Sequence, residues 1–200
     1  MAANFERRYS IEEYLTLDRE SEARLEFYNG KIFNMSGTSA EHNEIELNIA
    51  TNLRGQLRNR NCRLFLANMR IKVPAAPPYR YGDFSALCGA AEFEKIGGVD
   101  TVVNPSLIVE VLSPSTEKYD RTAKFKQYQS IASLVEYVLV SQDMAFVAQY
   151  VKRNNEWIYR SFSEMMDSIK LESLDCEIPL SEIYRNVALS EHASPDPETK

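Results

Sequence analysis

The stretch Leu107–Thr116, LIVEVLSPST, places a single glutamate inside an apolar run. Five of its first six residues are apolar, and such a continuous run is typical of a strand that is covered on both faces. A carboxylate there is costly unless it is paired or bound to a metal. We therefore predict that Glu110 belongs to a functional site, with an edge strand that turns Glu110 toward water as the alternative.

The segments on either side of this strand alternate between helix and strand patterns. SPST can cap a helix over 117–131, and Asn29-Gly30 predicts a hairpin. Ser10 and Glu13 form a capping box for a helix over 11–17. The remaining expected elements are a helix over 40–60, strands over 62–73, 80–87, 106–112, 135–141, 145–153 and 156–162, and a helical turn over 180–184. This order predicts an α/β (α+β) fold with a mixed central β-sheet flanked by helices and extended by antiparallel strands.

Length and composition favour one domain of a globular protein. The chain has 200 residues and no apolar run of membrane-spanning length, and its start lacks a signal peptide, so we expect a cytoplasmic protein without a membrane partner. The expected domain covers 1–188 and is followed by a polar tail over 189–200. Within it we expect an N-terminal helix and hairpin over 9–35, a core over 40–142 and C-terminal strands over 145–185.

The three cysteines, Cys62, Cys88 and Cys176, show neither a zinc pattern nor a disulfide framework. Buried free thiols are the expectation for all three, because a free cysteine behaves as a small apolar residue.

Charge is distributed unevenly along the chain. The net charge is −6, but the segment 47–82 has seven basic residues and no acidic one. A locally basic face is compatible with phosphate binding, and Arg54, Arg58 and Arg60 are the candidate nucleic-acid contacts. The alternative is a solvated helix end beside exposed strand faces.

Two further residues can act together with Glu110. Asp83 lies on the strand expected beside the Glu110 strand, so both carboxylates could share one divalent ion, although an aspartate after a glycine is also common in turns. On a helical wheel Lys124 faces the protein and Lys126 faces solvent. Asp120 lies one turn before Lys124 and could pair with it. The alternative is that Lys124 lies at the margin of the core with its amine in water.

Polar residues also interrupt the apolar stripe of the helix over 40–60. His42 and Glu46 are four residues apart, so they share one helix face with Ile45 and Ile49. They are either hydrogen-bonded core groups or site groups, and for a lone histidine the core group is the more common case.

The segments YGDFSA, NPSLIVEVLSPSTEKYDRTAKFKQY and SLVEYVLV together resemble the restriction endonuclease-like family within the PD-(D/E)XK nuclease superfamily. The upstream segment RLEFYNGKIFNMSGTSAEHNEI resembles the N-terminal motif of that family, so the resemblance covers about 9–184. It implies a restriction endonuclease-like core in which Asp83 and Glu110 are the motif carboxylates. Glu26 and His42 also match motif positions, whereas Glu46 has no clear match.

The chain departs from the motif at two positions. Gly82 replaces the proline that usually precedes the aspartate, and Leu112 replaces the lysine expected two residues after the glutamate. The resemblance implies that the basic role moves to the following helix, where Lys124 occupies the matching position. The helical wheel assigns Lys124 to the protein side independently.

The resulting hypothesis is a Mg²⁺- or Mn²⁺-dependent endonuclease that hydrolyses DNA. Asp83 and Glu110 would hold the metal and Lys124 would stabilise the transition state, with Glu26, His42, Glu46 and Asp120 in support. A homodimer is expected because many nucleases dimerise to cut two strands. The first alternative is a catalytically inactive nucleic-acid-binding or assembly protein on the same fold. The second is a structural dimer that associates through the strands over 145–153 and 156–162.

Overall fold

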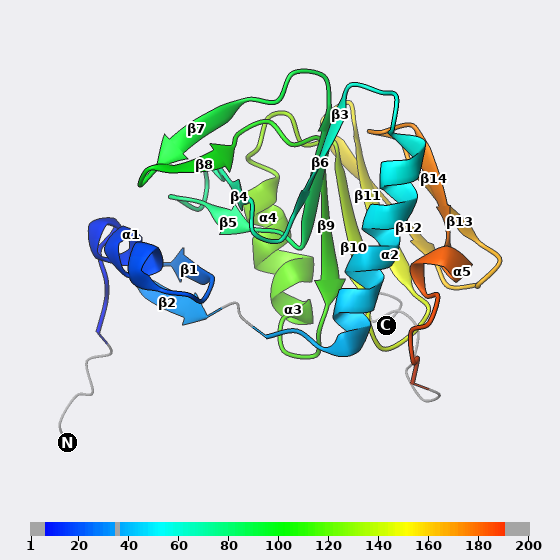
Figure 1. Ribbon diagram of the computed structural model, residues 1–200, viewed down its shortest axis with the longest axis horizontal. Coiled ribbons are helices and arrows are strands. Elements are labelled where there is room, and N and C mark those ends of the chain that lie inside the picture. The colour runs from blue at the N-terminus through cyan, green and yellow to red at the C-terminus, as the bar shows by residue number, and fades with distance from the viewer. Residues whose placement is uncertain (1–6, 35–36, 191–200) are drawn as a thin grey trace.

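The computed structural model describes residues 7–34 and 37–190, which form a mixed α+β fold around a six-stranded sheet (Figure 1). The fold class predicted from the sequence is confirmed. The strand order is β12-β11-β10-β9-β6-β3, with β9 and β10 parallel and the other neighbours antiparallel. The strands are β3 (Cys62–Leu66), β6 (Phe84–Cys88), β9 (Leu107–Leu112), β10 (Glu136–Ser141), β11 (Val147–Arg153) and β12 (Glu156–Phe162).

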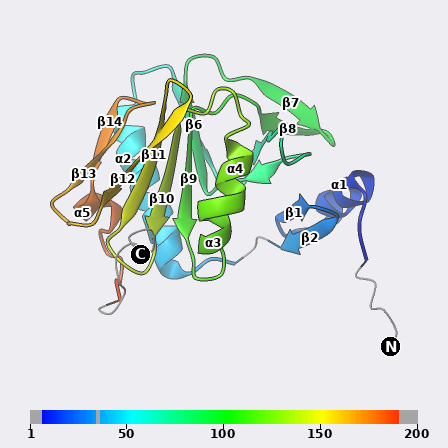
Figure 2. The same cartoon turned by 180° about the vertical axis from the view of Figure 1, so that it is seen from behind.

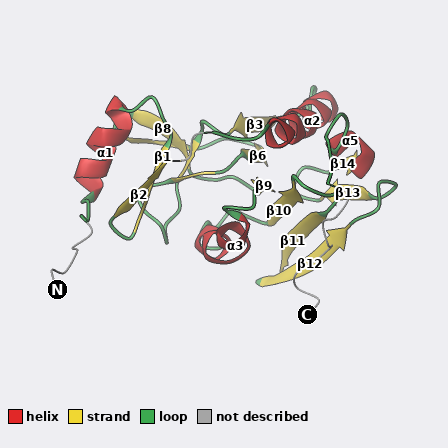
Figure 3. Ribbon diagram, turned by 90° about the horizontal axis from the view of Figure 1, so that it is seen from below, coloured by secondary structure: helices red, strands yellow, loops and turns green. Residues whose placement is uncertain are grey.

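Strand β9 lies in the middle of this sheet, and all six of its residues are buried. Helix α2 (Ala40–Gln56) covers one face of the sheet (Figure 3). The hairpin of β13 (Ser168–Leu171) and β14 (Cys176–Pro179) and the short helix α5 (Leu180–Ile183) pack on the same side as α2 (Figure 2).

The opposite face of the sheet is covered by one helical segment with three parts. These are α3 (Glu117–Tyr119), the π-helical turn η1 (Asp120–Lys124) and α4 (Phe125–Tyr128). Side chains alternate along β9, so Ile108, Glu110 and Leu112 share one face of the strand. Ile108 and Leu112 belong to the apolar core that includes Phe125 and Tyr128, which places Glu110 on the side of this helical segment.

A smaller N-terminal part lies beside the core. It consists of α1 (Ile11–Glu20) and the hairpin of β1 (Leu25–Tyr28) and β2 (Lys31–Asn34), next to a four-stranded sheet in the order β5-β4-β8-β7. The strands of that sheet are β4 (Arg70–Ile71), β5 (Arg80–Tyr81), β7 (Phe93–Ile96) and β8 (Val99–Val102). The predicted capping box of α1 is present, and Asn29 and Gly30 both have positive φ at the hairpin turn, as predicted.

Two predicted strands are each divided between the two sheets. The expected strand over 62–73 stops at Leu66 and resumes as β4, and the expected strand over 80–87 is interrupted at Gly82 and Asp83. The alternation of apolar residues continues across the first break, so the sequence pattern alone could not reveal it. At the second break the apolar positions shift from Tyr81 to Phe84 and Ala86, across Gly82-Asp83. The pairs β7–β8 and β13–β14 were not predicted, although Gly97-Gly98 is a recognised hairpin signal.

The expectation of three free thiols is wrong for two of the cysteines. Cys62 and Cys88 lie directly opposite each other in the β3–β6 ladder and form a disulfide. Only the strand register brings them together, because 26 residues separate them in the chain. Cys176 is buried and free, as expected.

Most of the predicted polar tail lies outside the described residues, since only its first two residues, 189 and 190, precede the last described position. Within the described ranges, no helix is both long enough and apolar enough to span a bilayer.

The N-terminal part is joined to the second sheet by a buried polar group. Asp18 of α1 forms an ion pair with Arg70 of β4 and accepts a hydrogen bond from the Tyr79 hydroxyl at 2.6 Å. Asp18 and Arg70 are 7% and 5% exposed, so removal of either would leave the other charge buried without its partner.

We expect the Asp18→Ala substitution to lower the free energy of unfolding by about 3–5 kcal/mol, because it leaves the Arg70 guanidinium uncompensated. Urea denaturation followed by circular dichroism measures this change. The matched control is Glu20→Ala, which removes an exposed acid from the same helix. Equal stability of the two variants would contradict this account of the N-terminal packing.

Candidate active site

A cleft of about 290 Å³ opens where β9 ends and α2 begins. One wall is formed by residues 113–124, and the other includes Arg24, Asn34 and residues 37–39. Five of the residues predicted from the sequence line it: His42, Asp83, Glu110, Asp120 and Lys124. Side chains from four separate parts of the chain therefore meet in one cavity.

Glu110 is paired within the cleft rather than exposed to water. Its side chain is 2% exposed, and its Oε2 lies 2.9 Å from the Nζ of Lys124. The hydroxyl of Tyr128 donates a hydrogen bond of 2.8 Å to the other carboxylate oxygen. The edge-strand alternative for Glu110 is therefore wrong.

Lys124 lies between two carboxylates at the end of the π-helical turn. Its Nζ is 3.4 Å from Asp120 Oδ1, and the side chains of both residues are at most 4% exposed. This pairing and the inward orientation of Lys124 confirm the helical-wheel prediction, and Lys126 is exposed as expected. π-Helical turns often occur at functional sites, and this one begins at Asp120 and ends at Lys124.

Asp83 follows the break between β5 and β6. Its Oδ2 accepts a hydrogen bond of 2.7 Å from the backbone N–H of Val111, so its carboxylate is held against the strand of Glu110. A Cβ atom at Gly82 would lie 3.2 Å from Ile108 and 3.4 Å from Glu110 Oε1. A residue without a side chain lets the chain pass this closely, which gives a structural reason for glycine at this position.

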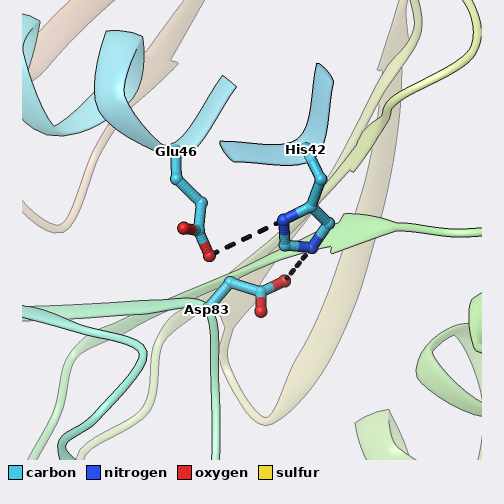
Figure 4. A group of neighbouring side chains, drawn as sticks. All are labelled: His42, Glu46 and Asp83. Carbon is cyan, nitrogen blue, oxygen red and sulfur yellow. Dashed lines mark ion pairs between the residues drawn. The ribbon is translucent and has the colours of Figure 1, made fainter. Parts of the chain in front are cut away.

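His42 and Glu46 of α2 form a group with Asp83 (Figure 4). His42 Nε2 lies 3.2 Å from Asp83 Oδ2, and His42 Nδ1 lies 3.8 Å from Glu46 Oε1. One ligand atom from each residue lies within 4.8 Å of the other two. This nitrogen and two carboxylates are a possible metal site, and among the described residues Glu110 is not part of this group.

One ring nitrogen of His42 has no hydrogen-bond partner. Nδ1 is buried, and its 3.8 Å separation from Glu46 is too long for a hydrogen bond. If Nε2 carries the proton that it shares with Asp83, Nδ1 presents a free lone pair. The residues present therefore fit a metal ion, which would satisfy this buried nitrogen.

The ionisation of the cleft residues reflects burial and neighbouring charges. Burial, and after it the negative charge of Asp83, raise the pKa of Glu46 to about 7. For His42, burial lowers the pKa, but Asp83 and Glu46 outweigh this effect and the pKa is raised. For Asp83, burial raises the pKa, but the contact with His42 and the charge of Lys124 lower it overall.

The pair at the floor of the cleft is strongly coupled. Burial lowers the pKa of Lys124, but the charges of Glu110 and Asp120 overcome this effect and raise the pKa well above its usual value. Lys124 therefore remains an ammonium at neutral pH.

Glu26 lies behind the cleft instead of lining it. Its Oε1 accepts a hydrogen bond of 2.8 Å from the backbone N–H of Tyr81, and Oε2 lies 3.9 Å from Arg80 Nε. Glu26 therefore anchors the end of β5 just before Gly82 and Asp83.

The three arginines predicted to contact nucleic acid lie at the other end of α2. His42 and Arg54 are twelve residues apart, which corresponds to about 18 Å along a helix. Arg54, Arg58 and Arg60 are exposed, and Arg60 donates a hydrogen bond of 3.1 Å to the backbone oxygen of Asp175. Arg70 and Arg80 are buried, so the basic segment does not form one continuous face.

Two contributors to the cleft were not predicted. Tyr128 has no place among the predicted site residues, whereas its hydroxyl donates a hydrogen bond to Glu110. The signal for this role was its position on the same helix face as Lys124. Arg24 lines the cleft as well, and its charge lowers the pKa of Glu46 against the effect of burial.

Comparison with known proteins supports a nuclease relationship. The model of the family Uma2, described as "Putative restriction endonuclease", matches residues 11–181. Two uncharacterized proteins of Synechocystis sp. (strain ATCC 27184 / PCC 6803 / Kazusa) are similar to this chain. The protein slr1290 is 29% identical over 180 residues, which are 90% of this chain and 93% of that protein. The protein sll1609 is 32% identical over 147 residues, which are 73% of this chain and 82% of that protein.

A solved structure has the same fold. It is the crystal structure of a "putative nuclease belonging to DUF820" from Anabaena variabilis, with a TM-score of 0.72 and 17% sequence identity. The similarity covers 88% of this chain and 98% of the other.

Metal affinity at the His42–Glu46–Asp83 group should rise with pH. A cation competes with protons for Glu46 and His42, so protonation below the pKa of about 7 of Glu46 weakens binding. We expect Mn²⁺ to bind roughly tenfold or more weakly at pH 6 than at pH 8, as measured by isothermal titration calorimetry. Glu46→Gln should reduce this pH dependence, and equal affinities of the parent at both pH values would contradict the assignment.

Proposed function

Because this chain belongs to the Uma2 family, described as "Putative restriction endonuclease", we propose that it is a metal-dependent endonuclease that hydrolyses phosphodiester bonds in DNA. The observation that carries the proposal is the buried Glu110–Lys124 pair, which shares one cleft with Asp83. A charged pair at this depth is often no more stabilising than apolar residues of similar volume. A role in chemistry gives a reason for its presence.

The proposed ligands of Mg²⁺ or Mn²⁺ are Asp83 and Glu110, with His42 and Glu46 in support. Carboxylate oxygens suit both ions, and a carboxylate oxygen has lone pairs beyond those used by Lys124 or Tyr128. When bound, such a cation activates water and neutralises charge on a phosphate. His42 would hold Asp83 in its present orientation through the contact at Nε2.

Lys124 is the proposed stabiliser of the transition state. Its ammonium lies at the floor of the cleft, where the low dielectric strengthens its interaction with the developing charge of a phosphate. Asp120 holds the side chain from the other side at 3.4 Å, so Lys124 is already positioned without substrate. Leu112, at the position where a lysine was expected, is 3% exposed within the apolar core.

The charge of the cleft also supports metal dependence. The charged side chains that line it are Arg24 and Lys124 against Asp83, Glu110 and Asp120, with His42 as a further titratable group. With the carboxylates ionised this lining is negative and repels a phosphate. A divalent cation would reverse this balance and let the substrate approach.

The cytoplasmic location and the homodimer stay predictions. Dimerisation would suit cleavage of two strands, and light scattering of the purified chain tests it.

We expect Lys124→Met to lower the rate of Mg²⁺- or Mn²⁺-dependent DNA cleavage by about 10²–10³-fold, because one electrostatic stabiliser of the transition state is lost. Cleavage of labelled DNA on denaturing gels measures the rate. The matched control is Lys126→Met, which removes an exposed lysine from the same helical segment and should cleave like the parent.

Thermal melting of each variant separates loss of chemistry from loss of folding. If Lys124→Met does not fold, Asp83→Asn serves as the second test, since it keeps the shape of the side chain but weakens a metal ligand. A folded variant of either kind that cleaves at the parental rate would refute the assignment.

A further inference from the structure

We propose that the cleft accepts an unpaired nucleotide of a single-stranded nucleic acid, whose base stacks on Tyr119 with Tyr28 extending the aromatic surface outward. This inference rests on the proposed nuclease function and names its class of substrate. It draws on the depth of the cleft, the aromatic residues beside it and the distribution of charge along its walls.

The charged groups at the floor of the cleft are deeply buried. Glu110, Asp120 and Lys124 are only 2–3% exposed. The cleft of about 290 Å³ lies at the lower end of the range of pockets that hold one small molecule. The cleft therefore has room for about one nucleotide, and a flexible single strand can bend its backbone into it more readily than a stiff duplex.

Two tyrosines that contact each other form an aromatic surface beside this cleft. Tyr119 of α3 lines it, and the ring of Tyr28 from β1 is centred 6.3 Å from the ring of Tyr119. Tyr28 is 41% exposed, although the apolar surface of a tyrosine is usually placed against other residues. The guanidinium of Arg80 lies 5.6 Å from the Tyr28 ring and holds it from below. Aromatic rings in this setting resemble the stacking surfaces that bind unpaired bases without regard to sequence.

The charges of the cleft favour a single strand over a duplex. A duplex binder neutralises phosphates of both strands with several basic residues. Here only Arg24 and Lys124 contribute cationic groups to the lining, and Lys124 is already paired. The remaining polar groups of the lining are mainly hydroxyls and amides, which suit one sugar and one phosphate; they include Asn34, Thr38, Ser39, Ser113, Ser115, Thr116 and Gln142.

The test measures binding separately from cleavage. Fluorescence anisotropy follows a labelled 12-nucleotide DNA strand, the same strand in a duplex, and an RNA strand of the same sequence. Ca²⁺ is used in place of Mg²⁺, and gels verify that the ligands remain intact. The proteins are the parent, Tyr119→Ala, Tyr119→Phe, Tyr28→Ala and the control Phe93→Ala, which removes a ring that is 40% exposed on β7 away from the cleft.

The parent should bind a single strand at least tenfold more tightly than the duplex. Tyr119→Ala should weaken that binding by about five- to 150-fold, which corresponds to the loss of one stacked base. Tyr28→Ala should weaken it as well, whereas Tyr119→Phe and Phe93→Ala should bind like the parent. Comparison of DNA and RNA strands shows which sugar the site prefers, and either preference supports the proposal if the tyrosine variants reduce it.

Two outcomes would overturn the proposal: duplex binding as tight as single-strand binding, or single-strand binding that is equal in the parent and in Tyr119→Ala. Either could occur while metal-dependent cleavage of DNA persists, and the proposed function would then stand without this inference. Absence of both binding and cleavage for every ligand would remove both.

Discussion

A carboxylate buried in the central strand constrains the rest of this structure. Glu110 lies on a strand without an exposed residue, and the cost of desolvating its charge must be offset by partners from the same low-dielectric region. Lys124 and Tyr128 supply those partners, and both come from the helical segment that follows the SPST turn. The helix therefore packs on this face of the sheet with a fixed rotation, because another rotation would leave Glu110 and Lys124 unpaired.

The site also requires the strand break between β5 and β6. Gly82 lets the chain pass close to Ile108 and Glu110, and Asp83 then replaces a regular ladder contact with a side-chain hydrogen bond to Val111. The same break transfers the chain from the small sheet to the large one. The N-terminal part and the core therefore meet at the residue that carries the second carboxylate, and His42 of α2 reaches it from the other face of the sheet.

Much of this arrangement could be predicted from the sequence, because it follows from the free-energy cost of burying a charge and from the periodicity of apolar residues in strands and helices. A glutamate within an apolar strand requires a partner, and a lysine on the buried face of a helix is a candidate for that role. The features that escaped prediction depend on tertiary register. The disulfide between Cys62 and Cys88 follows from the pairing of β3 with β6, and the break between β3 and β4 does not interrupt the alternation of the sequence. The hydroxyl of Tyr128 was missed because a tyrosine on a buried stripe is usually only an apolar core residue.

The two walls of the cleft have different origins, and this difference bears on how such a protein can diverge. The floor comes from β9 and the helical segment after it. Each charged group there is paired with another, so a single substitution would leave a buried charge without its partner. The opposing wall includes Arg24 and Asn34, which come from another part of the chain, at the two ends of the N-terminal hairpin. Substitutions on this wall can therefore change the contacts to a substrate while the buried pairs of the floor stay in place, so the choice of substrate can drift between relatives faster than the reaction itself.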